Sequence, residues 1–172
     1  MITTKQCRSL LAQHGPLESQ PPTDWMGDIP LPPAVEHFYA EVGPMDVAIE
    51  ATGDAYFLPR LASLWDIQAG YRYNALSGNP LPGWDEDWLV VADHGGDPFI
   101  LSLATSEVLL AKKGAAAWDP RPLFADVVEM AAVLATLGNV AREGALEREA
   151  AVAAIAELIG RASCRERVCW IV

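Results

Sequence analysis

Cysteine is scarce in this chain, whose three cysteines are Cys7, Cys164 and Cys169. Their irregular spacing provides neither a disulfide framework nor a zinc-binding pattern. The first residues lack the apolar core of a signal peptide, and no uninterrupted apolar run approaches the ~20 residues that a transmembrane helix needs. We therefore expect a cytoplasmic protein that uses no cysteine chemistry.

Basic residues are also few, with 12 Lys and Arg against 23 Asp and Glu and a formal net charge of −11. An acidic surface repels nucleic acid and anionic membranes, so we expect neither as a partner. A basic protein would be attracted. The 172 residues, of which 51% are hydrophobic, are enough for one domain with a substantial core.

The motifs of common catalytic sites are absent as well. There is no Gly-x-Ser-x-Gly, no phosphate-binding Gly-rich loop and no His-Glu-x-x-His. Carboxylates are plentiful, so pairs that could act in acid–base catalysis arise by chance. A metal site formed by Asp93, His94 and Asp97, with Asp87 as a further ligand, remains one alternative because hard cations need several converging oxygens. However, adjacent residues of a two-strand turn generally point to different sides.

The C-terminal end differs in composition from the rest of the chain. It resembles one translated frame of a short-read sequencing adapter, in the string Gly160-Arg161-Ala162-Ser163-Cys164-Arg165-Glu166-Arg167-Val168. We predict that residues 159–172 are a non-native tail. The alternative is a genuine basic tail with two redox-active cysteines. Without the tail the net charge is −13.

Hydrophobic periodicity predicts helices at both ends of the chain. Apolar residues recur at i, i+3, i+4 and i+7 in several segments, and proline or glycine bounds most of them. In the second helix, Pro32-Pro33 begins the first turn and Gly43 takes the left-handed cap. We expect helices over residues 4–14, 32–42, 59–70, 123–137 (capped by Gly138) and 145–158.

Strand signals lie between these helices. Residues 46–50 and 55–58 are predicted strands. Three further apolar runs joined by short turns predict an antiparallel meander over residues 88–111, with Asp93–Asp97 as its first turn. Helices, then sheet, then helices define an α+β fold with the C-terminal helices packed on one side. We expect one domain over residues 1–158.

Aromatic and acidic residues alternate just before the meander, in Trp84-Asp85-Glu86-Asp87-Trp88, with Tyr71 and Tyr73 a loop away. Aromatic residues beside charge are over-represented among interface anchors. We therefore predict a protein-binding surface formed by Trp84, Asp85, Glu86, Asp87, Tyr71 and Tyr73. The alternative is that both tryptophans belong to the core and the acids merely lie in solvent.

Four stretches carry a resemblance to a known family. They are the proline-then-helix element Ile29–Tyr39, the strand–Asp-x-Gly-Gly-Asp-Pro–strand stretch Trp88–Leu101, Val108 in the next strand, and Trp118 with the helix around Phe124 to Leu137. Over residues 29–138 the chain resembles the SUKH superfamily, which includes the fungal cell-wall-assembly regulator domain and many bacterial toxin-immunity proteins. The signature positions are Asp93, Gly95, Gly96, Asp97, Pro98 and Trp118.

The resemblance implies an α+β fold, no catalytic activity, no cofactor and a role in binding another protein. In bacteria the partner is typically a toxin from a neighbouring gene, which the immunity protein neutralises by direct contact. Combined with the acidic charge, this leads us to expect a basic toxin or effector domain as partner. Two alternatives stay open: an interaction module of a regulatory scaffold, and a metal-dependent enzyme using Asp93, His94 and Asp97.

Overall fold

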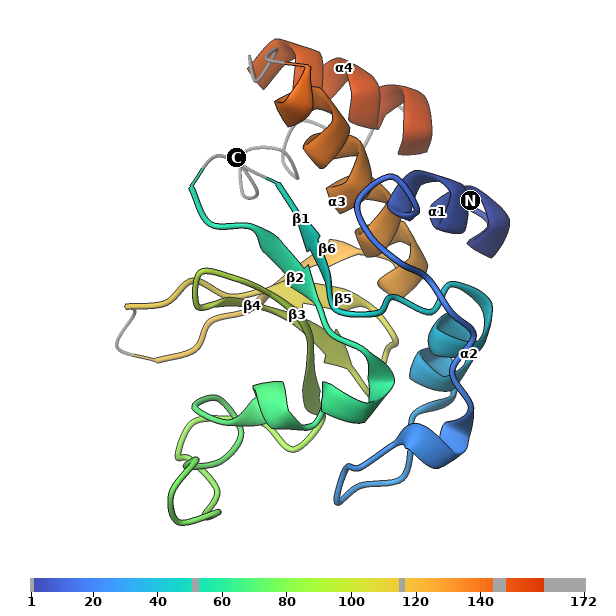
Figure 1. The fold of residues 1–172 in the computed structure, drawn as a ribbon. Coiled ribbons are helices and arrows are strands. Elements are labelled where there is room, and N and C mark those ends of the chain that lie inside the picture. The colour runs from blue at the N-terminus through green and yellow to red at the C-terminus, as the bar shows by residue number, and fades with distance from the viewer. Residues whose placement is uncertain (1, 51–52, 115–116, 144–147, 160–172) are drawn as a thin grey trace.

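The computed structural model describes residues 2–50, 53–114, 117–143 and 148–159. Its centre is one antiparallel sheet of six strands that follow one another in chain order (Figure 1). The strands are β1 (Val47–Ile49), β2 (Tyr56–Leu58), β3 (Trp88–His94), β4 (Asp97–Ser102), β5 (Val108–Leu110) and β6 (Arg121–Phe124). The helices are α1 (Thr4–Leu11), α2 (Pro33–Glu41), α3 (Val127–Arg142) and α4 (Arg148–Ile159). The predicted α+β class is confirmed.

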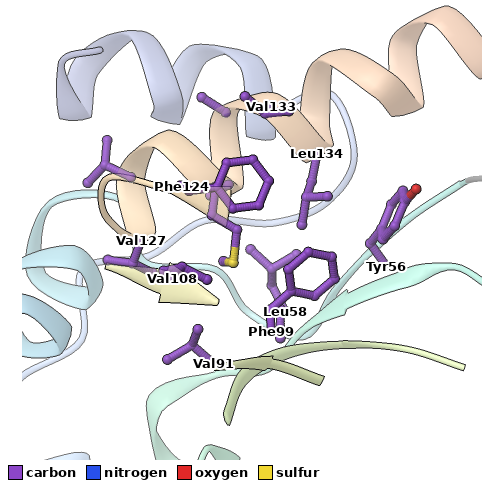
Figure 2. Packing of buried hydrophobic residues seen from close by; sticks show 14 of the residues in the cluster. Tyr56, Leu58, Val91, Phe99, Val108, Phe124, Val127, Val133 and Leu134 are labelled. Atoms are coloured by element: carbon purple, nitrogen blue, oxygen red, sulfur yellow. The ribbon is translucent and has the colours of Figure 1, made fainter. Parts of the chain in front are cut away.

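Helix α3 covers one face of the sheet, and α1 and α4 pack against α3 on its far side (Figure 1). Because neighbours surround it, nearly every residue from Val127 to Gly138 is buried. Figure 2 shows Phe99 of β4 directed toward Phe124 and Leu134, and the Phe99 and Phe124 ring centroids are 6.3 Å apart. Each such side chain contributes about 1.5–3 kcal/mol when fully buried. Within the described residues, no helix has both the length and the apolar composition needed to cross a bilayer.

The predicted meander over residues 88–111 is confirmed as β3, β4 and β5. Gly95 and Gly96 form its first turn with φ of 59° and 95°, and His94 pairs with Asp97. Two successive residues with positive φ match the twist of a two-residue hairpin, which explains the Gly-Gly pair. The predicted strands 46–50 and 55–58 are also present, shortened to β1 and β2.

The predicted helix over residues 59–70 is wrong. Two short 3₁₀ turns, Leu61–Ser63 and Asp66–Gln68, occupy this segment. The Gln68 side chain, expected on a helix face, is fully buried and bonds to the backbone of Val90 in β3. Gln68 thus bonds to the sheet, while the backbone of the segment forms 3₁₀-type hydrogen bonds, such as Leu64 N to Leu61 O and Ala69 N to Asp66 O, in place of those of a regular α-helix.

The helix predicted over residues 123–137 begins later and ends later. Leu123 belongs to the unpredicted strand β6, which tolerates Pro122 because it lies at the edge of the sheet. The side chain of Asp126 then caps α3 by accepting a hydrogen bond from Glu129 N at 2.8 Å. Gly138 does not end the helix, which continues to Arg142.

The two terminal helices also differ from their predicted bounds. The first ends at Leu11 rather than residue 14. The last runs from Arg148 to Ile159, so the helix includes residue 159, the first residue of the predicted tail. Residues 145–147 of the predicted helix and residues 160–172 of the predicted tail lie outside the described residues.

Candidate functional site

The face of the sheet opposite α3 is covered by aromatic side chains from loops and strand ends. Ile100, Leu109 and Ala111 are buried there, 0%, 9% and 1% exposed, beneath Trp84, Trp88 and Trp118. Tyr71 completes this layer. The four residues, here called the aromatic cluster, have neighbouring ring centroids 5.5–5.7 Å apart and are half-buried: Tyr71, Trp84, Trp88 and Trp118.

Mostly edge-on ring packing and two hydrogen bonds orient the aromatic cluster. Trp84 Nε1 donates to the backbone oxygen of Trp88 at 3.1 Å, and the Tyr71 hydroxyl donates to Asp93 Oδ2. Buried polar ends of aromatic residues need such partners, while the ring faces remain available for apolar contact. The tryptophans therefore cover a small core and also have partly exposed side chains.

Between Trp84 and Trp88 lies the acidic segment, Asp85–Asp87, whose three side chains are exposed. Its backbone is tightly held, because Asp85 Oδ1 accepts from Asp87 N at 2.9 Å and Asp87 O accepts from Leu103 N at 2.8 Å. No basic side chain in the described parts of the chain forms an ion pair with these carboxylates. Within the described residues these three carboxylates are therefore outside any ion pair, and the backbone that carries them is ordered.

Arg72 ties the acidic segment to the loop that precedes it. One guanidinium nitrogen of Arg72 donates to Glu86 O at 3.0 Å and to Trp88 O at 3.1 Å. Its guanidinium carbon lies 5.7 Å from the Trp65 ring centroid. Sequence reasoning missed this role, because nothing in a single arginine signals that its partners are backbone oxygens 14 and 16 residues away.

Tyr73, predicted to share the binding surface, lies elsewhere. Its hydroxyl donates to Trp65 O at 3.0 Å, and its ring centroid is 6.0 Å from that of Trp65. The structure brings Tyr71, Trp84, Trp88 and the acidic segment together, adds Trp118, and places Tyr73 against Trp65 instead.

Asp93 and Asp97, the carboxylates of the alternative metal site, are engaged within the hairpin. Asp93 Oδ1 accepts from Gly96 N at 3.1 Å, in addition to the bond from Tyr71 to its other oxygen. Asp97 Oδ1 accepts from Lys113 N at 2.7 Å, and its Oδ2 lies 3.1 Å from Lys112 Nζ. Both carboxylates therefore hold the turn and its neighbouring loop in place.

His94, the third member of that alternative, packs on Tyr56 with ring centroids 4.4 Å apart. Its Nε2 is buried and has no hydrogen-bond partner within the described residues. Across the described ranges, no three His, Cys, Asp or Glu side chains converge as metal ligands would. The geometry therefore gives the metal alternative no support.

Two other predicted features have clear positions. Pro98 is buried in β4, and its carbonyl accepts from Ala111 N at 3.2 Å. Cys7 is buried in α1, where desolvation, followed by the charge of Asp126, raises the pKa of its thiol to about 12. At neutral pH this thiol stays protonated, which disfavours it as a nucleophile.

Tyr71 offers a spectroscopic probe of the aromatic cluster. Burial raises the pKa of Tyr71, and the hydrogen bond to Asp93 and the charges of Asp93 and Asp97 raise it further. In the unfolded chain this phenol ionises near its ordinary pKa of about 10. Since the folded chain holds the proton longer, we expect folding stability to fall as pH rises above about 10.

The test is a pH titration followed by the ultraviolet absorbance of phenolate, carried out on wild type and on Tyr71→Phe. The difference between the two titration curves is the contribution of Tyr71 alone. Asp93→Asn removes a negative charge and should lower the pKa of Tyr71. An unchanged Tyr71 titration in Asp93→Asn would contradict the assigned hydrogen bond.

No family model, curated protein or solved structure matches this chain.

Proposed function

We propose that this protein is a non-enzymatic protein-binding domain, and specifically a bacterial immunity protein of the SUKH type that neutralises a toxin by direct contact in the cytoplasm. The observation that carries the proposal is the pairing of the aromatic cluster with the acidic segment on the sheet face that α3 leaves uncovered. Aromatic anchors with a charged rim are a common composition of protein interfaces.

The charge distribution supports a basic partner. Residues 73–111 contain six Asp or Glu and no Lys or Arg, and the chain as a whole carries −11. Complementary charge raises association rates and disfavours wrong partners. A toxin domain that acts on nucleic acid is the kind of basic effector that this surface would attract, because such domains need cationic surfaces of their own.

Co-expression tests the proposal. Each effector domain encoded beside this gene would be expressed alone and together with the chain, with bacterial growth as the readout. We expect one of them to be toxic alone and harmless with the chain. If none is toxic alone and rescued by the chain, the proposal is wrong; co-purification with a regulatory complex instead would favour the scaffold alternative.

Neutralising the acidic segment should slow binding of that effector. In the triple variant Asp85→Asn, Glu86→Gln and Asp87→Asn we expect the association rate constant at low salt to fall about tenfold or more, because electrostatic steering is reduced. The matched control removes three negative charges elsewhere, at the exposed residues Glu18, Glu36 and Glu41, each changed to Gln.

Stopped-flow association at low and high salt separates the two variants. The acidic-segment variant should lose most of the salt dependence, whereas the control should retain it. Equal effects in the two variants would mean that only net charge matters and that the acidic segment is not at the interface.

A further inference from the structure

Leu76 is 98% exposed, although leucine is one of the residues most often buried in proteins. Among the described residues only one other large apolar side chain is exposed, Met26 at 67%. Leu76 lies in the loop of residues 74–83. This loop belongs to the green part of the chain, at the end of the molecule opposite α4 (Figure 1). A single exposed leucine is common on protein surfaces, so what distinguishes Leu76 is the loop that holds it and the surface beside it.

The backbone around Leu76 is ordered by hydrogen bonds. Asn74 Oδ1 accepts from Leu76 N at 2.9 Å and from Ser77 N at 3.0 Å. Asn74 O accepts from Gly78 N at 2.8 Å, and Asn74 N donates to Asn79 O at 2.8 Å. Every side chain from Asn74 to Pro80 is exposed. The loop therefore holds a solvent-exposed leucine on an ordered backbone, among residues that are themselves exposed.

The base of the loop connects it to the acidic segment. Leu81 N donates to Arg72 O at 3.0 Å, and the same Arg72 donates from its side chain to Glu86 O and Trp88 O. Tyr73 packs on Trp65 beneath. The loop, Arg72 and the acidic segment thus belong to one continuous unit between Tyr71 and Trp88, so a partner that docks on the acidic segment approaches the same unit that carries Leu76.

We infer that Leu76 is the apolar anchor of the interface, inserted into an apolar pocket that is surrounded by Lys or Arg on a basic protein partner. This inference rests on the proposed function. Charge complementarity favours a basic rim around the pocket, since residues 73–111, which include Leu76 and the acidic segment, have no Lys or Arg, and Arg72 beside them donates to backbone oxygens. The ordered loop reduces the conformational entropy lost on binding, which is the usual advantage of a preorganised contact.

The experiment measures the equilibrium affinity with which wild type and variants of this chain bind the purified effector domain identified by co-expression. Leu76→Ala should weaken binding roughly 10- to 100-fold, the value of burying one leucine side chain. Leu76→Asp should weaken it further, because a carboxylate would enter an apolar pocket. Leu76→Met keeps an apolar side chain and should stay within about threefold of wild type.

Ala153→Asp is the matched control, since it adds the same charge at an exposed position of α4, at the other end of the molecule. It should bind like wild type. Because Leu76 is 98% exposed, all variants should unfold thermally at the wild-type temperature, which separates lost binding from lost folding.

Three results would overturn the inference, and they are distinguishable. If Leu76→Asp binds like wild type while the acidic-segment variant binds slowly, the anchor is wrong and the proposed function stands. If the wild-type chain binds none of the adjacent effectors, the proposed function fails and the anchor with it. If sedimentation shows a wild-type dimer that Leu76→Asp converts to a monomer, Leu76 is occupied by a second copy of this chain.

Discussion

The Gln68→Leu variant should lose about 3 kcal/mol of folding stability, the largest effect that we expect from one substitution in this protein. Gln68 is 0% exposed. Its Oε1 accepts from Val90 N at 2.9 Å, and its Nε2 donates to Val90 O at 2.8 Å and Leu64 O at 2.9 Å. Leucine has a similar volume but can make none of these bonds.

The loss is large because Val90 has no strand beside it on that side. β2 pairs with β3 only at Asp93 and His94, and the chain turns away after Leu58. The Gln68 amide therefore takes the place of a missing strand residue, donating and accepting as a backbone amide would. Each buried backbone group left without a partner costs about 1–3 kcal/mol.

Urea unfolding of wild type and Gln68→Leu measures the difference. The control is Gln13→Leu at an exposed position, which should change stability by less than about 0.5 kcal/mol. A loss below about 1 kcal/mol in Gln68→Leu would mean that water replaces the glutamine and that the side chain is not a required partner of the strand.

Gly138→Ala should also destabilise the fold, by about 2 kcal/mol, although intrinsic helix propensity alone predicts a gain of about 1 kcal/mol. A Cβ at Gly138 would lie 2.3 Å from Ile49 Cγ2 and 2.7 Å from His14 Cε1. To relieve both contacts, either the two side chains would have to shift or α3 would have to move away from β1 and from the segment after α1 that carries His14. Because the close contacts predict a loss of folding stability and helix propensity predicts a gain, the sign of the measured stability change distinguishes the two effects.

A double-mutant cycle with Ile49→Ala identifies the cause. Removing Ile49 Cγ2 relieves the closest contact, so the cost of Gly138→Ala should be smaller in that background, with a coupling of about 1 kcal/mol. If Gly138→Ala instead stabilises the protein, or if the two substitutions are additive, the helix and strand do not meet closely at this glycine.

Local signals were predicted well from the sequence, and Gly43 shows why. Its φ is 64°, and a Cβ there would lie 1.7 Å from Glu18 O, so only glycine fits the predicted cap of α2. The Gly95-Gly96 turn was predicted for the same reason. The positive φ of these glycines depends on residues adjacent in the chain, so local preferences predict it, whereas the close approach of Gly43 to Glu18 is seen only in the structure.

The candidate site was predicted only in part. Tyr71, Trp84 and the acids were chosen from composition, and the structure does bring these together. Trp118 joins them from a distant segment, and Tyr73 turns toward Trp65. No local pattern distinguishes Tyr71 from Tyr73, because the difference depends on which side of the loop meets the sheet.

The sequence by itself determined the α+β class, the helices at both ends, the strands from β1 to β5, the central hairpin and the acidic balance, because periodicity, turn residues and charge act locally or in sum. Only the tertiary structure decided that aromatic side chains rather than a helix cover the second face of the sheet, that Gln68 substitutes for a strand, and that Gly138 lies inside a helix. Each of these depends on contacts between residues far apart in the chain, whose pairing is chosen by packing.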